Sequence, residues 1–230
     1  VLMRQHALGF VKPHAAWQPC RDTGTAPANR LLPVAAGEVV LGKAFNGATV
    51  DPFYGWDNEY GQHRAQVPVF EASQYLVSNQ EFLAFVEAGG YREDRYWSEE
   101  GLNWRNYARA EHPTFWHHAG SGSNAGNSSG WQLRLMAEVI AMPWDWPAEV
   151  NCLEAQAFCR WQSEQLCRPV RLPSEDEWQR LYAVSGAREV ANDAAADSNR
   201  HLDHYASSCP VTRFRHGDFF DVTGNVWQWT

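Results

Sequence analysis

The chain has 230 residues, a formal net charge of −8 and a hydrophobic fraction of 44%. The negative charge argues against a nucleic-acid partner, because no basic field is available to attract phosphates. No apolar run approaches the length of a membrane span, and residues 1–30 lack the apolar centre of a signal peptide. We therefore expect a cytoplasmic protein without nucleic-acid or membrane partners, long enough for one large domain.

The aromatic and cysteine content favours an irregular fold with free thiols. Twelve tryptophans suggest that aromatic packing and indole hydrogen bonds hold the chain together. Five cysteines is an odd number, which does not suit a disulfide framework. Cys152, Cys159 and Cys167 fall seven and eight residues apart on a predicted helix, too far along its axis for neighbouring disulfides. We expect five free thiols in a reducing compartment.

The first 36 residues are expected to precede the main domain. Residues 1–5 resemble the end of a helix, and residues 11–36 carry repeated turn formers that are typical of an extended linker. The folded domain should begin with a short strand at 37–42, and a second strand is expected at 67–72.

Three helices can be placed from their first residues. Ser78 with Glu81, and Ser174 with Glu177, have the capping-box spacing, in which each side chain satisfies a free backbone N–H. Asn151 is a third cap. The helices are expected at about residues 78–88, 151–166 and 174–184.

The remaining segments are short or irregular. Residues 92–116 should be mostly loop with one short helix, and 119–130 a flexible Gly/Ser-rich insertion. Residues 131–140 alternate as a strand does, and 185–205 are polar and irregular. Short helices and short antiparallel strands in mixed order indicate an α+β domain.

The last ten residues, 221–230, form the most distinctive stretch. Trp227 and Trp229 are two apart, so in an extended segment both indoles would lie on one face. Gly224 and Asn225 precede them and can turn the chain tightly. From the pattern alone, a core strand after a hairpin is expected here.

This stretch, GNVWQWT at 224–230, resembles the signature of the formylglycine-generating, sulfatase-modifying domain family. Further motifs of that family follow upstream in order: WDNE at 56–59, VSNQEF at 77–82, GGY at 89–91 and RLPSEDEW at 171–178. Within the family the chain looks most like the central domain of the iron-dependent sulfoxide synthases of ovothiol biosynthesis. That likeness is carried by Gln228, where most relatives have glutamate, PWDWP at 143–147 and SSCPV at 207–211.

The resemblance implies a fold and a domain order. The family's fold is an irregular relative of the C-type lectin fold, with short helices and strands. Residues 1–36 would be the end of a preceding helical domain with its linker. Residues 37–230 would be a formylglycine-generating-enzyme-like domain that continues past Thr230.

The resemblance also implies an activity for the full-length protein. It would use Fe(II) and O2 to join the sulfur of cysteine to the imidazole of histidine, giving a sulfoxide. Three histidines of the preceding helical domain would hold the iron, so that domain is an expected partner. The catalytic residues would lie beyond Thr230, so none is named here, and this chain alone would be inactive.

A calcium site is the one metal site that the resemblance places in this chain. The family's positions correspond to the Asp221 carboxylate, the Gly224 and Val226 carbonyls and the Gln228 amide oxygen, and calcium prefers such oxygen ligands. The alternative is that Asp221 and Gln228 only hydrogen-bond the turn. The other signature residues are expected to be structural: Asn225, Trp227 and Trp229.

Other polar clusters favour structural roles. His201 and His204 could share a helix face and bind a metal, but no cap or apolar periodicity supports a helix there, so a solvated loop is favoured. Structural roles are likewise expected for His117–His118, Asp57–Glu59, and Arg171 with Glu175–Glu177.

Three alternative functions stay open at this point. An ergothioneine-type sulfoxide synthase and a formylglycine-generating enzyme would carry the same domain. A non-catalytic binding module on this fold belongs to a different class. The residues after Thr230, and a histidine-bearing domain upstream, would discriminate among them.

Overall fold

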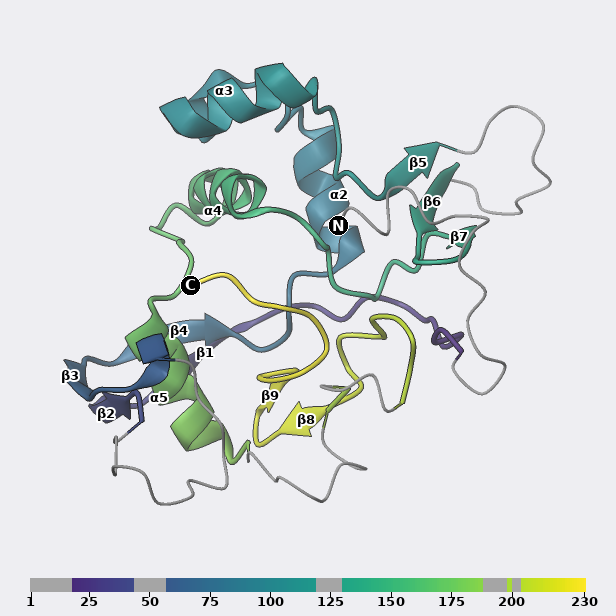
Figure 1. The fold of residues 1–230 in the computed structure, drawn as a ribbon. Helices are drawn as coiled ribbons and strands as arrows, with labels where there is room; N and C mark the ends of the chain where they lie inside the picture. The colour runs from purple at the N-terminus through teal and green to yellow at the C-terminus, as the bar shows by residue number, and fades with distance from the viewer. Residues whose placement is uncertain (1–17, 44–56, 119–129, 188–197, 200–203) are drawn as a thin grey trace.

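The structure is a computed structural model that describes residues 18–43, 57–118, 130–187, 198–199 and 204–230. It consists of short helices and small antiparallel sheets, so the α+β prediction is confirmed (Figure 1). Within these ranges, no helix has the length and apolar character needed to cross a membrane. The predictions for residues 1–5, for 119–129 and for most of 188–203 lie outside the described residues.

The helices are only partly those predicted, because residues 92–116 contain two helices where mostly loop and one short helix are expected. They are η1 (Asp57–Glu59), α2 (Asn79–Glu87), η2 (Asp94–Tyr96), α3 (Glu99–Ala108), α4 (Cys152–Leu166) and α5 (Glu175–Ser185). Both predicted capping boxes are present, at the start of α2 and of α5. A further box joins Asn151 and Glu154 at the start of α4. Each box satisfies N–H groups that have no partner inside the helix.

Within the described residues, the strands form four small antiparallel sheets. Strand β1 (Leu31–Val34) pairs with β4 (Phe70–Ser73), and β2 (Gly37–Leu41) pairs with β3 (His63–Val67). Strand β6 (Trp131–Arg134) lies between β5 (Trp116–His118) and β7 (Val139–Ala141) and pairs with both. Strand β8 (Arg215–His216) pairs with β9 (Phe219–Phe220). The single strand predicted at 131–140 is wrong, because the chain turns between Leu135 and Glu138 and forms the β6–β7 hairpin. The strand expected at 67–72 is divided between the end of β3 and β4.

Residues 18–36, predicted as part of a linker, pack on the domain. Strand β1 pairs with β4, and Cys20 lies in the main hydrophobic cluster. Thr23 Oγ1 and Gly24 N–H donate hydrogen bonds of 2.9 and 2.8 Å to the two oxygens of the buried Asp145 carboxylate. These contacts attach the segment to the domain, while the position of a domain boundary stays a prediction.

Two hydrophobic clusters divide the molecule into two halves. The larger cluster includes Phe82, Phe85 and Phe158 and lies among α2, α4 and the β5–β7 sheet. The smaller cluster includes Val34 and Phe219 and packs against α5. Figure 1 shows α2, α3 and α4 together in one half, with α5, β1–β4 and β8–β9 in the other.

The C-terminal segment contacts both halves. Its Trp229 bonds to Val150, just before α4, and its Gln228 bonds to Trp178 in α5. The signature stretch is therefore placed where the two halves meet.

Candidate functional site

The signature stretch leaves the β8–β9 hairpin at a strained turn. Asp221 has a φ of 49°, in the left-handed region that costs a non-glycine residue energy. Its N–H donates a 2.7 Å hydrogen bond to the Phe214 carbonyl, which holds this conformation. Gly224 has a φ of 92°, which a glycine adopts readily. The turn predicted before the two tryptophans is thus present.

Asn225 fastens this turn to a distant segment. Its Oδ1 accepts a 3.1 Å bond from the Cys209 N–H, and its Nδ2 donates at 2.9 Å to the Cys209 carbonyl. The same amide nitrogen donates at 3.0 Å to Asp221 Oδ2. All three residues are buried. Asn225 thus joins the turn to Cys209, and no sequence signal indicates that Cys209 is its partner.

Gln228 closes the other side of the turn. Its Nε2 donates to the Asp221 carbonyl at 2.8 Å and to the Val222 carbonyl at 3.2 Å. Its Oε1 accepts a 3.2 Å bond from the Trp178 indole N–H. The side chain thus joins the signature stretch to α5.

The contacts of Asp221 and Gln228 bear on the predicted calcium ligands. Burial raises the pKa of the Asp221 carboxyl to about 8, and its Oδ1 is buried without a hydrogen-bond partner. An orphaned carboxylate oxygen fits the chemistry of a cation ligand, whereas the Gln228 amide oxygen faces Trp178. The observed bonds match the alternative in which both side chains hold the turn. The site formed by Asp221, Gly224, Val226 and Gln228 stays a prediction.

The two signature tryptophans lie at the surface and in no strand. Trp227 is fully exposed and Trp229 is 47% exposed, and the chain from 222 to 230 makes no strand pairing. Trp229 Nε1 donates a 3.0 Å bond to the Val150 carbonyl. The core strand predicted here is therefore wrong. The indoles of Trp227 and Trp229 instead form part of an exposed apolar surface.

A cavity of about 660 Å³ lies along this stretch. Trp178, Trp227 and Gln228 line it, with Tyr75 and Phe220, whose ring centroids are 4.8 Å apart. Small-molecule sites have this size and this mixture of aromatic walls with a few polar groups. It is the candidate functional site of the chain.

Two carboxylates at this cavity are occupied by helix capping. Glu81 accepts from the Ser78 N–H at 3.0 Å and from Asn29, and burial raises its pKa. Arg171 donates two bonds of 2.7 Å to Glu177 and lowers the pKa of that carboxyl. The helix-start network predicted for Arg171 and Glu177 is confirmed.

The remaining predicted clusters assemble no metal site in the part of the chain that the structure describes. His201 lies outside the described residues. His204 donates its backbone N–H to Asn199, and its ring packs against Phe214. Asp57–Glu59 forms the 3-10 helix η1, where the Glu59 carbonyl accepts from the Lys43 N–H.

One buried acidic pair was missed from the sequence. The Tyr91 hydroxyl donates a 2.6 Å bond to Glu154 Oε1. Burial raises the pKa of Glu154 to about 7, and burial with the neighbouring carboxylate raises the pKa of Tyr91. The available signal was Glu154 at the third position after Asn151, which marks it only as a cap residue.

All five cysteines are free thiols in the structure. Burial raises the pKa of Cys159 to about 11 and raises that of Cys209 further. Both thiols are thereby kept protonated, as is typical of structural rather than reactive cysteines.

Comparison with known proteins decides the family. The model of the "Sulfatase-modifying factor enzyme 1-like domain" matches residues 20–230. The chain belongs to this family. The resemblance inferred from the sequence motifs is thereby confirmed.

Three relatives show what else carries this domain. The chain is 32% identical to a hercynine oxygenase of Mycolicibacterium thermoresistibile, over 93% of this chain and 47% of that protein. It is 30% identical to a hercynine oxygenase of Mycolicibacterium smegmatis, over 92% and 47%. It is 24% identical to a formylglycine-generating enzyme of Mus musculus, over 87% and 57%. The chain thus spans about half the length of these relatives, and its family is one of oxidative enzymes.

Proposed function

We propose that this chain is part of a sulfoxide synthase that joins the sulfur of cysteine to the imidazole ring of histidine, as in ovothiol biosynthesis. The observation that carries the proposal is the similarity to hercynine oxygenases over 93% of the chain. Gln228 and the motifs at 143–147 and 207–211 favour the ovothiol type. The ergothioneine type is the second candidate, because the relatives just named are hercynine oxygenases.

The proposed reaction balances with O2 as the oxidant. A C–S bond forms as the thiol and one imidazole carbon each lose a hydrogen. One oxygen atom of O2 is bonded to sulfur, and the other leaves as water with the two hydrogens. Bound Fe(II) would supply the activation of O2.

The iron is assigned to the preceding helical domain. Among the described residues, no three His, Cys, Asp or Glu side chains gather to hold a metal. The donor set therefore does not fit an iron site within this part of the chain, and we assign the iron ligands to histidines upstream. That domain would be a partner of this one, and we place the protein in the cytoplasm.

This chain would contribute one wall of the substrate site. The cavity of about 660 Å³ beside Gln228 has indole walls, which suit a flat imidazole ring. The exposed Trp227 would be covered when the rest of the protein is present, and its burial would exclude water from the reacting groups. Gln228 is held by Trp178, so its position is set before a substrate enters.

The test uses the full-length protein with Fe(II), O2 and cysteine, supplied with histidine or with hercynine, its trimethylammonium derivative. Mass spectrometry of the products distinguishes the candidates. A sulfoxide from histidine supports the ovothiol type, and one from hercynine alone supports the second candidate. No sulfoxide from either substrate, with iron-loaded protein, would overturn both.

A variant pair tests the cavity itself. Trp227→Ala in the full-length protein should lower kcat/KM by roughly tenfold, since an indole wall contact with the substrate is lost. Tyr107→Ala is the matched control, because Tyr107 is a 91% exposed aromatic residue on α3 and does not line this cavity. Equal kcat/KM values for the two variants would remove Trp227 from the site.

A further inference from the structure

A second cavity, of about 510 Å³, opens in the helical half of the molecule. It lies among the end of α2, the end of α3 and strands β5 and β6. Its basic lining residues are Arg92, Arg105, Arg109, His112 and His118, and its one described acidic lining residue is Glu111. A chain with a net charge of −8 thus gathers three arginines around one cleft. Such a cleft concentrates positive potential locally.

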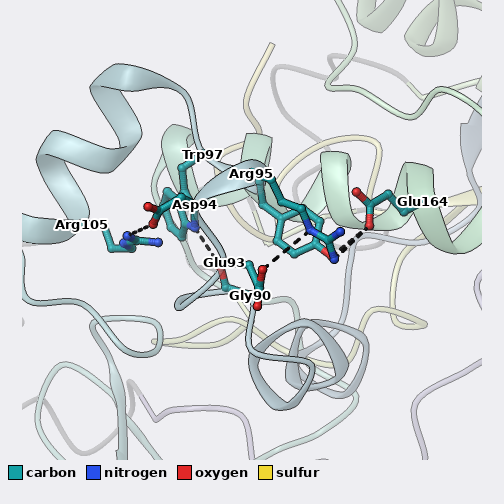
Figure 2. Close-up of polar contacts among 8 residues, drawn as sticks. Gly90, Glu93, Asp94, Arg95, Trp97, Arg105 and Glu164 are labelled. Carbon is teal, nitrogen blue, oxygen red and sulfur yellow. Dashed lines mark hydrogen bonds and ion pairs between the residues drawn. The ribbon is translucent and has the colours of Figure 1, made fainter.

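Arg105 lines the cleft, and its guanidinium group is held by two neighbours. Its side chain is 11% exposed, and its guanidinium carbon lies 5.6 Å from the Trp97 ring centroid. Figure 2 shows one guanidinium nitrogen, Nη2, bonded to the Asp94 carboxylate. The other, Nη1, is buried and has no hydrogen-bond partner. A buried charged donor left unpaired is costly, so it calls for an acceptor.

The other two arginines are free to serve a ligand. In the described parts of the chain, neither the Arg92 nor the Arg109 side chain makes a hydrogen bond or an ion pair, and both are exposed. Arginine near the end of α3 also balances the helix dipole. That effect needs only a charge near the helix end, so it does not explain why Arg105 Nη1 is buried without an acceptor.

Aromatic rings form another part of the lining. His118 packs over Trp131 with ring centroids 3.7 Å apart, and the His112 ring centroid lies 5.2 Å from that of the same indole. His117, the neighbour of His118 on β5, does not line the cleft. Adjacent strand residues point to opposite faces, so His118 lies beside the cavity and His117 does not.

We propose that this cleft is a second ligand site, which binds a small organic molecule through its carboxylate or phosphate group. The oxyanion would accept from the buried Arg105 Nη1 and from Arg92 and Arg109 at the rim, as charge-assisted hydrogen bonds. The body of the ligand would pack on the ring wall formed by His118 and Trp131. The site is separate from the cavity beside the signature stretch, because no described residue lines both.

Isothermal titration calorimetry on the full chain tests the proposal, with inorganic phosphate and with succinate as probes. Saturable binding of one or both is expected, and it should weaken with added salt because the rim arginines are exposed. The stronger probe identifies the preferred oxyanion. The double variant Arg92→Gln/Arg109→Gln should bind at least roughly tenfold more weakly, since it loses two charged donors.

The matched control removes two exposed arginines elsewhere. Arg64→Gln/Arg215→Gln changes the net charge equally, at β3 and β8, away from the cleft. It should bind the probe as the parent chain does, and melting curves will show that both double variants fold. No saturable binding of either probe, or equal weakening in both double variants, overturns the proposal.

Discussion

The cluster of aromatic rings around α2 and α4 (the ring cluster) and the signature stretch at 221–230 are held together by different interactions. Around α2 and α4, Phe82 stacks on Phe158 with ring centroids 5.3 Å apart, and Phe85 is fully buried against several rings. Around the signature stretch, the buried Asn225 and the half-buried Gln228 hold the backbone through directed hydrogen bonds. Burial of rings is non-directional and sums over many contacts, whereas each of these hydrogen bonds needs its particular partner.

These two regions also use tryptophan differently. Trp116 and Trp146 are 1% exposed and belong to the main cluster, but Trp227 is fully exposed. An indole in the core contributes stability, while one at the surface of a cavity is available for a ligand or a partner. We therefore expect substitutions of buried rings to lower stability, whereas substitution of the exposed Trp227 should affect function and leave stability nearly unchanged.

The largest effect is expected in the ring cluster. The Phe85 ring is fully buried, with its centroid 5.4 Å from that of Phe82 and 5.9 Å from that of Trp161. Phe85→Ala removes this ring and should reduce the free energy of unfolding by about 3–5 kcal/mol. Urea unfolding of the purified chain measures the loss. Phe85→Leu is the control and should lose less. A loss below about 1 kcal/mol for the alanine variant would contradict the contrast between the ring cluster and the signature stretch.

Calcium bound at the predicted site should stabilise the folded chain. At calcium concentrations a hundredfold above Kd, the expected gain is about 2.7 kcal/mol, seen as a higher melting temperature than in chelator. Asp221→Ala should abolish the difference. Asp218→Ala, which removes an exposed carboxylate nearby, should retain it. Equal melting temperatures of the parent chain in both conditions, with no calcium by elemental analysis, would reject the site.

Asn225→Ala should weaken the hydrogen bonds that hold the signature stretch to Cys209, a residue that also belongs to the larger hydrophobic cluster. The substitution leaves the Cys209 backbone groups and Asp221 Oδ2 without their buried partner, at a cost of roughly 1–3 kcal/mol. Chemical denaturation measures this change. Asn225→Asp should lose at least as much, because a second carboxyl would then face Asp221. If both variants were as stable as the parent chain, the hydrogen bonds of Asn225 would contribute nothing to the free energy of unfolding.

The pH dependence singles out Glu154 in the helical half. Its folded pKa of about 7 lies above the ordinary value of 4.5, because burial favours the neutral form. The folded state holds this proton more tightly, so Glu154 contributes stability below pH 4.5 that is lost as the pH rises through 7. The slope approaches at most about 1.4 kcal/mol per pH unit. Asp221, whose pKa burial raises to about 8, contributes a slope of the same sign. The slope of the free energy of unfolding between pH 4.5 and 7 should therefore become smaller in Glu154→Gln without vanishing, and an unchanged slope would assign the titration elsewhere.

The smallest effect on stability is expected at the exposed tryptophan. The Trp227 side chain is fully exposed and buries almost no surface. Trp227→Ala should therefore change the free energy of unfolding by less than about 0.5 kcal/mol, as is usual for surface substitutions. Tyr107→Ala should behave in the same way. A large loss for Trp227→Ala alone would mean that the indole is packed in solution, which would remove the contrast between the ring cluster and the signature stretch.

Local signals predicted the helices well and the short strands poorly. The boxes at Ser78 and Ser174 involve residues three apart, so the sequence contains the whole interaction. The turn between β6 and β7 runs through Leu135 to Glu138, which include no glycine, proline, asparagine or aspartate. The usual turn signals are absent there, so the pattern favoured a single strand.

The sequence by itself determined the family, the α+β class and the starts of α2, α4 and α5. Only the tertiary structure decided that Asn225 holds Cys209, sixteen positions earlier, and that Trp227 is left exposed. A period of two predicts that side chains share a face, but it does not tell whether another segment covers that face. Capping is satisfied within one helical turn, whereas burial and cavity walls depend on segments that meet only when the chain folds.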